Sequence, residues 1–129
     1  MSNKKGFTLV EIIIVVAIIA LLAAIAIPNL LRAKVSANDA LAKGTLRTLS
    51  TATETYATAN SGNYPLQSTS LTGATPAYVN KDYCGQTIAG FAYTCTFNAS
   101  YYTFVAAPVT AGTTGTTTFT MTTGGVLTP

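Results

Sequence analysis

The longest uniform pattern along the chain is an unbroken apolar run near its N-terminus. No polar side chain occurs from Ile12 to Ile27, and Glu11 stands directly before this run. At about 1.5 Å per residue, residues 7–31 are long enough to cross a hydrocarbon layer of about 30 Å as a helix. The pattern therefore predicts a helix over 7–31 that is covered by lipid or by other helices.

Beyond this run the pattern changes to the three- and four-residue spacing of an amphipathic helix. The apolar or small side chains of one stripe are Leu31, Val35, Ala42, Leu46, Leu49, Thr53 and Tyr56. This spacing predicts that the helix continues over 32–60 and packs the stripe against a sheet. Asp39 and Lys43 are spaced for an ion pair on the helix surface. The Asn- and Gly-rich sequence at 60–63 predicts where the helix stops.

Two residues interrupt the uniformity of the apolar helix. Pro28 lacks the N–H group that would bond to the carbonyl of Ala24, so we expect a helix kink at Pro28. A carboxylate at the centre of a membrane helix costs about 2.5–3.5 kcal/mol, and less near an end. Glu11 therefore either lies in water at headgroup depth or finds a counter-charge.

The C-terminal part alternates with the period of two that is typical of strands. A Gly-, Ser-, Thr- and Pro-rich connection over 61–90, with a short helical turn near Leu66–Leu71, precedes this part. The alternating stretches are Phe91–Phe97, Tyr101–Ala107 and Thr116–Thr122, with a short edge at Val126–Thr128. The fold class predicted is α+β, with a long N-terminal helix whose amphipathic half packs on an antiparallel sheet of three or four strands within 91–129.

Composition removes most catalytic chemistry from consideration. The chain of 129 residues has no histidine, two cysteines and a formal net charge of +3. It therefore has no Ser/His/Asp triad and no His/Cys metal cluster, and we expect no enzyme, no cofactor and no metal site. Two of the basic residues, Lys4 and Lys5, lie before the apolar run, so the charge gives no support for direct nucleic-acid binding.

Cys84 and Cys95 form an even pair. If the C-terminal part reaches an oxidising compartment, a disulfide between them is expected; the alternative is two reduced, buried thiols. A bridge over this short loop would contribute roughly 3 kcal/mol to stability in the chain-entropy treatment.

The octapeptide Lys4-Lys5-Gly6-Phe7-Thr8-Leu9-Val10-Glu11, with the apolar run to Pro28, resembles the processing site of type IV pilins and type II secretion pseudopilins. In that family a short basic leader ends in Gly, Phe follows it, and a Glu opens a long apolar helix. The resemblance implies that prepilin peptidase cleaves between Gly6 and Phe7 and methylates the amino group of Phe7, and that Glu11 acts in assembly. The new amine would lie one helical turn from Glu11, and either the same chain or a neighbouring subunit would supply the pair.

The resemblance also implies an organisation and a set of partners. The leader covers 1–6, a transmembrane and filament-core helix covers 7–31, and a globular pilin head covers 32–129. The partners are other copies in a homo-oligomeric helical filament, prepilin peptidase, an inner-membrane assembly platform and an ATPase motor. The precursor would be a single-pass protein of the bacterial inner membrane with its N-terminus in the cytoplasm, which the leader lysines favour and Arg32 and Lys34 oppose. The assembled subunit would be extracellular.

The sequence is compatible with several functions. The structural subunit of a type IV pilus is favoured over the major pseudopilin of a type II secretion system, because no Asp or Glu follows Asp82 to supply a late calcium site. A small secreted binding module would result if a signal peptidase cut after Ala26. An aromatic electron path along the stem is disfavoured, since Tyr56 is the one aromatic residue between Thr8 and Asn63.

Overall fold

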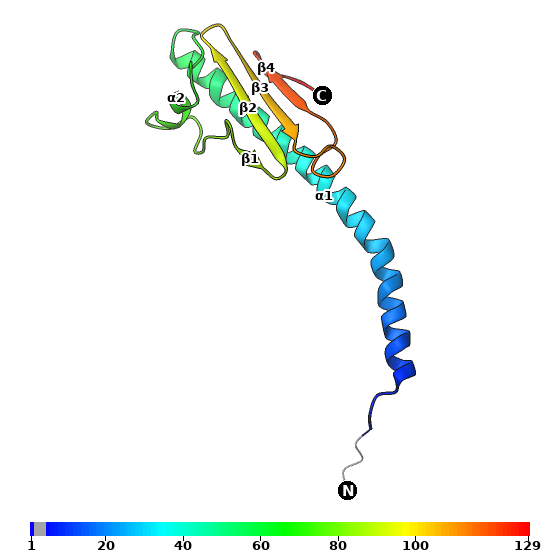
Figure 1. Ribbon diagram of the computed structural model, residues 1–129. Helices are drawn as coiled ribbons and strands as arrows, with labels where there is room; N and C mark the ends of the chain where they lie inside the picture. The colour runs from blue at the N-terminus through cyan, green and yellow to red at the C-terminus, as the bar shows by residue number, and fades with distance from the viewer. Residues whose placement is uncertain (2–4) are drawn as a thin grey trace. The chain divides into compact units, whose positions relative to one another are not determined.

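The computed structural model describes Met1 and residues 5–129 (Figure 1). Lys4, the first basic residue of the predicted leader, lies outside the described residues, as do Ser2 and Asn3. The described chain separates into two compact units, 1–33 and 34–129. Helix α1 begins in the first unit and ends in the second.

Helix α1 spans Leu9–Ala59 and is 51 residues long. The prediction of one long N-terminal helix is confirmed, and the helix ends one residue before the predicted limit. Ser61 and Gly62 both have a positive φ, and the Gly62 N–H donates to the Ala57 carbonyl oxygen at 2.8 Å. This geometry satisfies a carbonyl of the last helical turn and stops the helix. Pro28 lies inside α1, and helical structure is present on both sides of it.

The second unit contains a five-stranded antiparallel sheet in the order β1-β2-β3-β4-β5. The strands are β1 (Thr87–Ile88), β2 (Phe91–Asn98), β3 (Tyr101–Pro108), β4 (Phe119–Thr122) and β5 (Val126–Thr128). The predicted α+β class is confirmed, but the prediction of three or four strands was one or two too few. Strand β1 was assigned to the connecting loop, because a strand of two residues is too short to display alternation.

The core of this unit lies between the sheet and the outer part of α1, as Figure 1 shows. The helix supplies Ala42, Leu46 and Leu49, and the strands supply Phe91, Tyr93, Tyr102, Phe104, Ala106, Phe119 and Met121. The predicted stripe is therefore correct from Ala42 onward. It is wrong at Leu31, whose side chain is 57% exposed.

Two consecutive helix residues hold the loop between β3 and β4. The Asn38 side-chain amide donates to the Thr114 carbonyl at 2.9 Å, and Asp39 accepts from the Thr116 N–H at 2.9 Å and from its hydroxyl at 2.6 Å. The expected Asp39–Lys43 ion pair does not form; the Lys43 ammonium instead lies 4.8 Å from the centre of the Phe119 ring. Because Thr116 is bound to the helix, the strand predicted to begin there begins at Phe119.

The connection between α1 and β1 is held down at several points. It contains the short helix α2 (Thr69–Thr72), close to the predicted turn, and the Leu71 side chain of α2 is fully buried. The Tyr78 ring makes an edge contact with Tyr56 of α1, with ring centres 5.5 Å apart. The Ser68 hydroxyl donates to Asp82 at 2.8 Å, and the same carboxylate accepts from the Cys84 N–H. The loop is thus ordered by contacts rather than by secondary structure.

The predicted disulfide is confirmed, since Cys84 and Cys95 are bonded to each other. Cys95 belongs to β2, and Cys84 lies near the end of the connection, three residues before β1, so the bridge attaches the connection to the sheet. This attachment matters because β1, the neighbouring edge strand, contributes only two residues of pairing.

We expect the double replacement Cys84→Ala and Cys95→Ala to lower the free energy of unfolding by about 3 kcal/mol, because the unfolded chain regains the entropy that the bridge removes. Urea titration of the full chain in detergent micelles, followed by the near-ultraviolet signal of tyrosine, measures this. An unchanged urea midpoint would contradict the expectation. The oxidised and reduced wild-type chains serve as the matched control.

Glu54 of α1 gathers donors from three separate segments. Its carboxylate accepts from the hydroxyls of Tyr64 at 3.1 Å and Tyr102 at 2.8 Å, and from the Gly124 N–H at 2.9 Å. The Tyr102 hydroxyl in turn bonds to the Ser50 hydroxyl at 2.7 Å. One side chain of the helix therefore holds the start of the connection that follows α1, the strand β3 and the turn between β4 and β5.

We expect Glu54→Ala to lower the free energy of unfolding by about 2 kcal/mol, because the partly buried donors lose a charged acceptor. Glu54→Gln keeps an acceptor oxygen and should cost less than Glu54→Ala. The same urea titration measures both variants. Equal stability of the wild type and Glu54→Ala would show that water replaces the carboxylate without loss.

Burial, reinforced by the Glu54 carboxylate, raises the pKa of Tyr102 to about 12, while bonds from Ser50 and Gly125 act in the opposite direction. A raised folded-state pKa means that stability is fully present below the unfolded value of about 10 and is lost as pH rises toward 12. We therefore expect stability to fall between pH 10 and pH 12. The fall should be smaller in Tyr102→Phe, and an identical pH profile for the two proteins would contradict the assignment.

Candidate functional site

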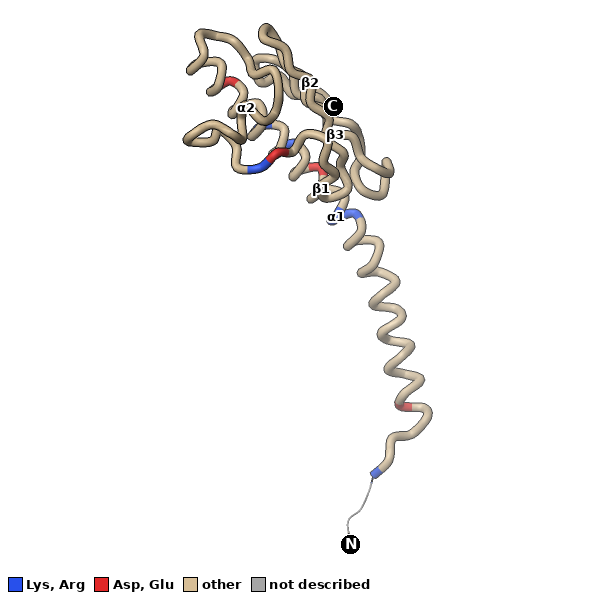
Figure 2. Tube along the Cα trace, turned by 60° about the vertical axis from the view of Figure 1, so that its left-hand side comes forward, with Lys and Arg blue, Asp and Glu red and all other residues tan. Residues whose placement is uncertain are grey.

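The apolar half of α1 is covered by nothing in the described chain. Its large side chains are about half exposed or more, and Leu30, for example, is 69% exposed. Within the described residues, α1 is the one helix that is long and apolar enough to cross a membrane, judged by length and composition, with a mean hydropathy of 3.2 over its most apolar window. Figure 2 shows that charged residues are sparse along this segment. So large an apolar surface marks a place where lipid or protein must pack.

The residues before α1 are extended and open. Lys5, Gly6 and Phe7 are not helical, and the Phe7 side chain is 86% exposed. Together with Glu11 these three residues line a small open pocket of about 190 Å³. The predicted cleavage position, the Gly6–Phe7 bond, thus lies outside the helix and two residues before its start. The structure places the predicted processing residues and Glu11 next to one another.

Thr8 and Glu11 close the start of α1 by bonding to each other. The Thr8 N–H and hydroxyl donate to the same Glu11 carboxylate oxygen, Oε2, at 2.7 and 2.8 Å, and the Glu11 N–H lies 3.2 Å from the Thr8 hydroxyl oxygen. This is a reciprocal capping box, in which each side chain binds the backbone N–H of the other residue. Thr8 was not singled out from the sequence, although the spacing Thr-x-x-Glu before an apolar run is the signal that predicts such a box.

Pro28 lies far along the helix from this group of residues, and it makes no part of the pocket at the start of α1. Its expected kink stays a prediction. Cys84 and Cys95 belong to the second unit and have a structural role there.

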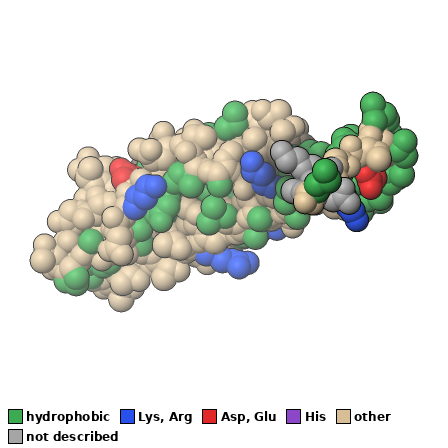
Figure 3. All heavy atoms as spheres, turned by 90° about the horizontal axis from the view of Figure 1, so that it is seen from below, with side chains coloured by type: hydrophobic (Ala, Val, Ile, Leu, Met, Phe, Trp, Pro, Cys, Tyr) green, Lys and Arg blue, Asp and Glu red, His purple; other side chains and the backbone are tan. Residues whose placement is uncertain are grey.

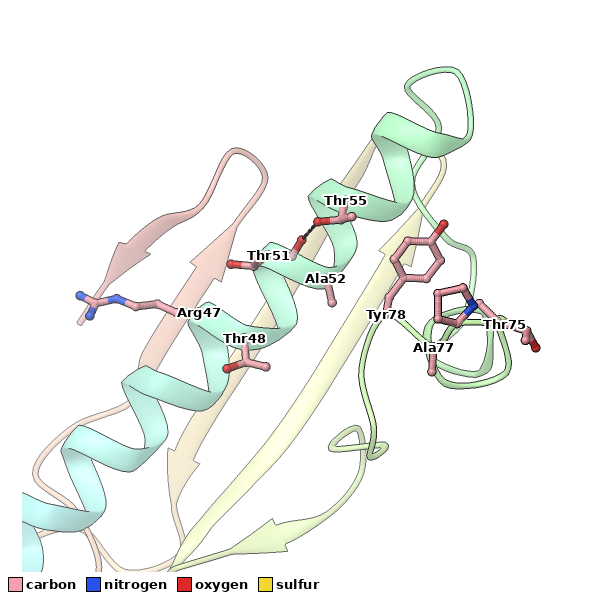
Figure 4. Close-up of a pocket in the computed structure, with 10 residues that line it drawn as sticks. Arg47, Thr48, Thr51, Ala52, Thr55, Thr75, Ala77 and Tyr78 are labelled. Atoms are coloured by element: carbon pink, nitrogen blue, oxygen red, sulfur yellow. Dashed lines mark hydrogen bonds between the residues drawn. The ribbon is translucent and has the colours of Figure 1, made fainter.

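One groove of the second unit has a volume of about 670 Å³. It lies between α1, from Arg47 to Thr55, and the loop from Ala74 to Tyr78. Figure 4 shows threonine side chains on one side and Tyr78 on the other, with Arg47 directed away from the loop; Thr55 bonds to the backbone of its own helix. No carboxylate or thiol lines the groove. It therefore offers shape and hydroxyl groups but no converging catalytic groups.

The described residues contain no group of three or more His, Cys, Asp or Glu side chains placed to hold a metal ion. On the face that Figure 3 presents, basic side chains are scattered rather than gathered into one patch. A dense basic stripe is the usual mark of a nucleic-acid-binding surface. The two distinctive features are thus the uncovered apolar part of α1 and the open segment before its capped start.

Comparison with known proteins identifies this segment. The family described as the prokaryotic N-terminal methylation motif matches residues 1–27. The N-terminal segment is thus similar to this methylation motif. The chain is also similar to the major component PilA4 of the type IV wide pilus of Thermus thermophilus, with 67% identity over 39 residues, and to the type IV major pilin protein PilA of Myxococcus xanthus, with 48% identity over 54 residues. The predicted resemblance to type IV pilins is confirmed.

The similarity covers a limited part of each protein. It spans 30% of this chain and 30% of the Thermus protein, and 42% of this chain and 24% of the Myxococcus protein. The chain therefore matches less than a third of the length of either relative. No solved structure shows significant similarity to the chain. Both relatives are named as structural components of pili, and neither name describes an enzyme.

Proposed function

We propose that the chain is the structural subunit of a type IV pilus, cleaved between Gly6 and Phe7 by prepilin peptidase and methylated at Phe7. The observation that carries the proposal is the match of residues 1–27 to the methylation motif, directly followed by an apolar helix surface with no cover in the described chain. Cleavage by a peptidase requires an accessible backbone, and the segment before α1 is open. Assembly requires an apolar surface for packing between subunits, and the uncovered part of α1 supplies one.

The helix supports a two-stage role. In the precursor, lipid covers the apolar half of α1, which is long enough to span a bilayer. In the filament, the same surface packs against the helices of sister subunits, so that the apolar surface stays out of water at both stages. The precursor then lies in the inner membrane with Lys5 and the N-terminus in the cytoplasm, and the head lies on the other side. The assembly platform and the ATPase motor complete the partners.

Glu11 is the residue proposed to act in assembly. It is the one charged residue between Lys5 and Arg32, so its carboxylate enters an otherwise apolar interface. Cleavage before Phe7 creates an amine close in sequence to this carboxylate. A carboxylate among packed helices is tolerated when a cation and hydrogen-bond donors accompany it. Pairing between the amine and Glu11 would favour one axial position of neighbouring subunits over others.

The pilus subunit is favoured over the pseudopilin of a type II secretion system. No acidic residue follows Asp82 to supply carboxylates for a late calcium site, and the loop between β3 and β4 is held by bonds of Asn38 and Asp39 to Thr114 and Thr116. Both relatives are named as pilus proteins. The location of the assembled filament, on the cell surface or in the periplasm, separates the two functions.

We expect filaments sheared from the cell surface to contain the chain beginning with N-methyl-Phe7, as read by N-terminal sequencing and mass spectrometry of the main band. We expect Glu11→Ala to insert into the membrane in normal amount but to give few or no filaments. Glu11→Asp, which keeps the charge, is the matched control. A mature protein beginning at Ile27, or normal filaments from Glu11→Ala, would contradict the proposal.

A further inference from the structure

We propose that Thr8 is a positioning residue for Glu11, and that the two side chains act as one unit with a single carboxylate oxygen open to an outside cation. The inference deepens the proposed function, on which it rests, because it names the residue that prepares Glu11 before any neighbouring subunit arrives. Thr8 belongs to none of the residues to which the sequence patterns assigned a role.

The geometry fixes the two carboxylate oxygens differently. Both donors of Thr8, the N–H and the hydroxyl, bind Oε2 of Glu11. Among the described residues, no group donates to Oε1. One residue thus holds the carboxylate through its backbone and its side chain together, which leaves the side chain of Glu11 little freedom to rotate. The oxygen that remains open is Oε1.

The chemistry of the donors decides what this arrangement does. The N–H and O–H groups of Thr8 are neutral, so they solvate the anion without cancelling its charge. Hydrogen bonds to a charged acceptor are stronger than those between neutral groups, and an anion beside hydrocarbon requires such donors. The start of a helix adds a favourable partial positive charge. Glu11 therefore reaches the apolar layer as a solvated anion that still attracts a cation.

This arrangement removes a cost from assembly. A free glutamate would lose side-chain entropy when it paired with an incoming amine, and it would also give up water on both oxygens. In the capping box the orientation is already set, and only Oε1 has to exchange water for the cation. The box also begins α1 at Leu9, which keeps the Gly6–Phe7 bond outside the helix before cleavage.

Thr8 could serve only as a helix cap, or it could also position Glu11. Suitable substitutions of Thr8 distinguish these two roles. Gly caps a helix about as well as Thr but has no hydroxyl, and Ser caps well and keeps the hydroxyl. Thr8→Ser should therefore assemble like the wild type. Thr8→Gly and Thr8→Val should each give about tenfold less filament, the factor that one hydrogen bond to a charged group typically contributes.

The experiment expresses each full-length variant as the sole copy and measures sheared filament relative to precursor in the membrane, with N-terminal sequencing of both fractions. Normal filament yield from Thr8→Gly would reduce Thr8 to a helix cap and overturn the proposal. Loss in Thr8→Ser equal to that in Thr8→Val would also overturn it. A Thr8→Val precursor that is not cleaved would contradict it as well, by placing Thr8 in recognition by the peptidase.

A second measurement reads the box without any filament. In the full chain in detergent micelles, the Thr8 amide should be protected from hydrogen exchange in the wild type and lose that protection in Glu11→Ala. The Glu11 amide should lose protection in Thr8→Val but not in Thr8→Ser. Unprotected amides in the wild type would overturn the box itself. A wild type that forms no filament beginning at Phe7 would instead overturn the proposed function, so the two failures are distinguishable.

Discussion

An apolar helix surface that no other part of the described chain covers is the constraint on which the rest of the structure depends. The large side chains from Ile12 to Leu31 are exposed over at least half of their surface, whereas the helix from Ala42 onward buries one side against the sheet. Burying such a surface is the main favourable term in protein association. The side chains of the sheet that face α1 are already buried in the core of the second unit. This surface therefore requires a second apolar environment, supplied by lipid or by protein.

The second unit, 34–129, has a small core, so its stability depends on further contacts between its segments. Both edge strands of its sheet are short: β1 has two residues and β5 has three. Three kinds of cross-link compensate: the Cys84–Cys95 bridge, the Asp39 contact with Thr116, and the Glu54 contacts with Tyr64, Tyr102 and Gly124. The contacts of Asp39 with Thr116 and of Glu54 with Tyr102 join segments that are far apart in sequence, and the bridge ties the connection to the neighbouring strand β2. Small domains commonly depend on such ties, since their buried area alone gives little stability.

The acidic residues show why the sequence predicted so much of the fold and less of its polar contacts. Helix and strand periods are local properties, so α1, β2, β3 and the short edge β5 were predictable from their own residues. The partners of Asp39 and Glu54 are set by how the chain returns to the helix, with 77 and 48 residues separating Asp39 from Thr116 and Glu54 from Tyr102. Spacing along the helix alone pairs Asp39 with Lys43, whereas in the fold the Asp39 carboxylate bonds to Thr116.

In the candidate site, too, the sequence predicted some features and not others. Gly6, Phe7 and Glu11 were found from the short motif, because recognition by a peptidase requires residue types in a fixed local order. The capping box of Thr8 and Glu11 is equally local, and the Thr-x-x-Glu spacing signals it, whereas the charge of Glu11 alone points only to a cation as its partner. The structure shows two neutral donors of Thr8 bound to this carboxylate. A charge at the edge of hydrocarbon has two separate needs, solvation and neutralisation, and different residues can meet them at different times. Thr8 meets the first need within the isolated chain. In the assembly that we propose, a cation from a partner meets the second, so that the same carboxylate is stable beside hydrocarbon and still attracts a neighbouring subunit.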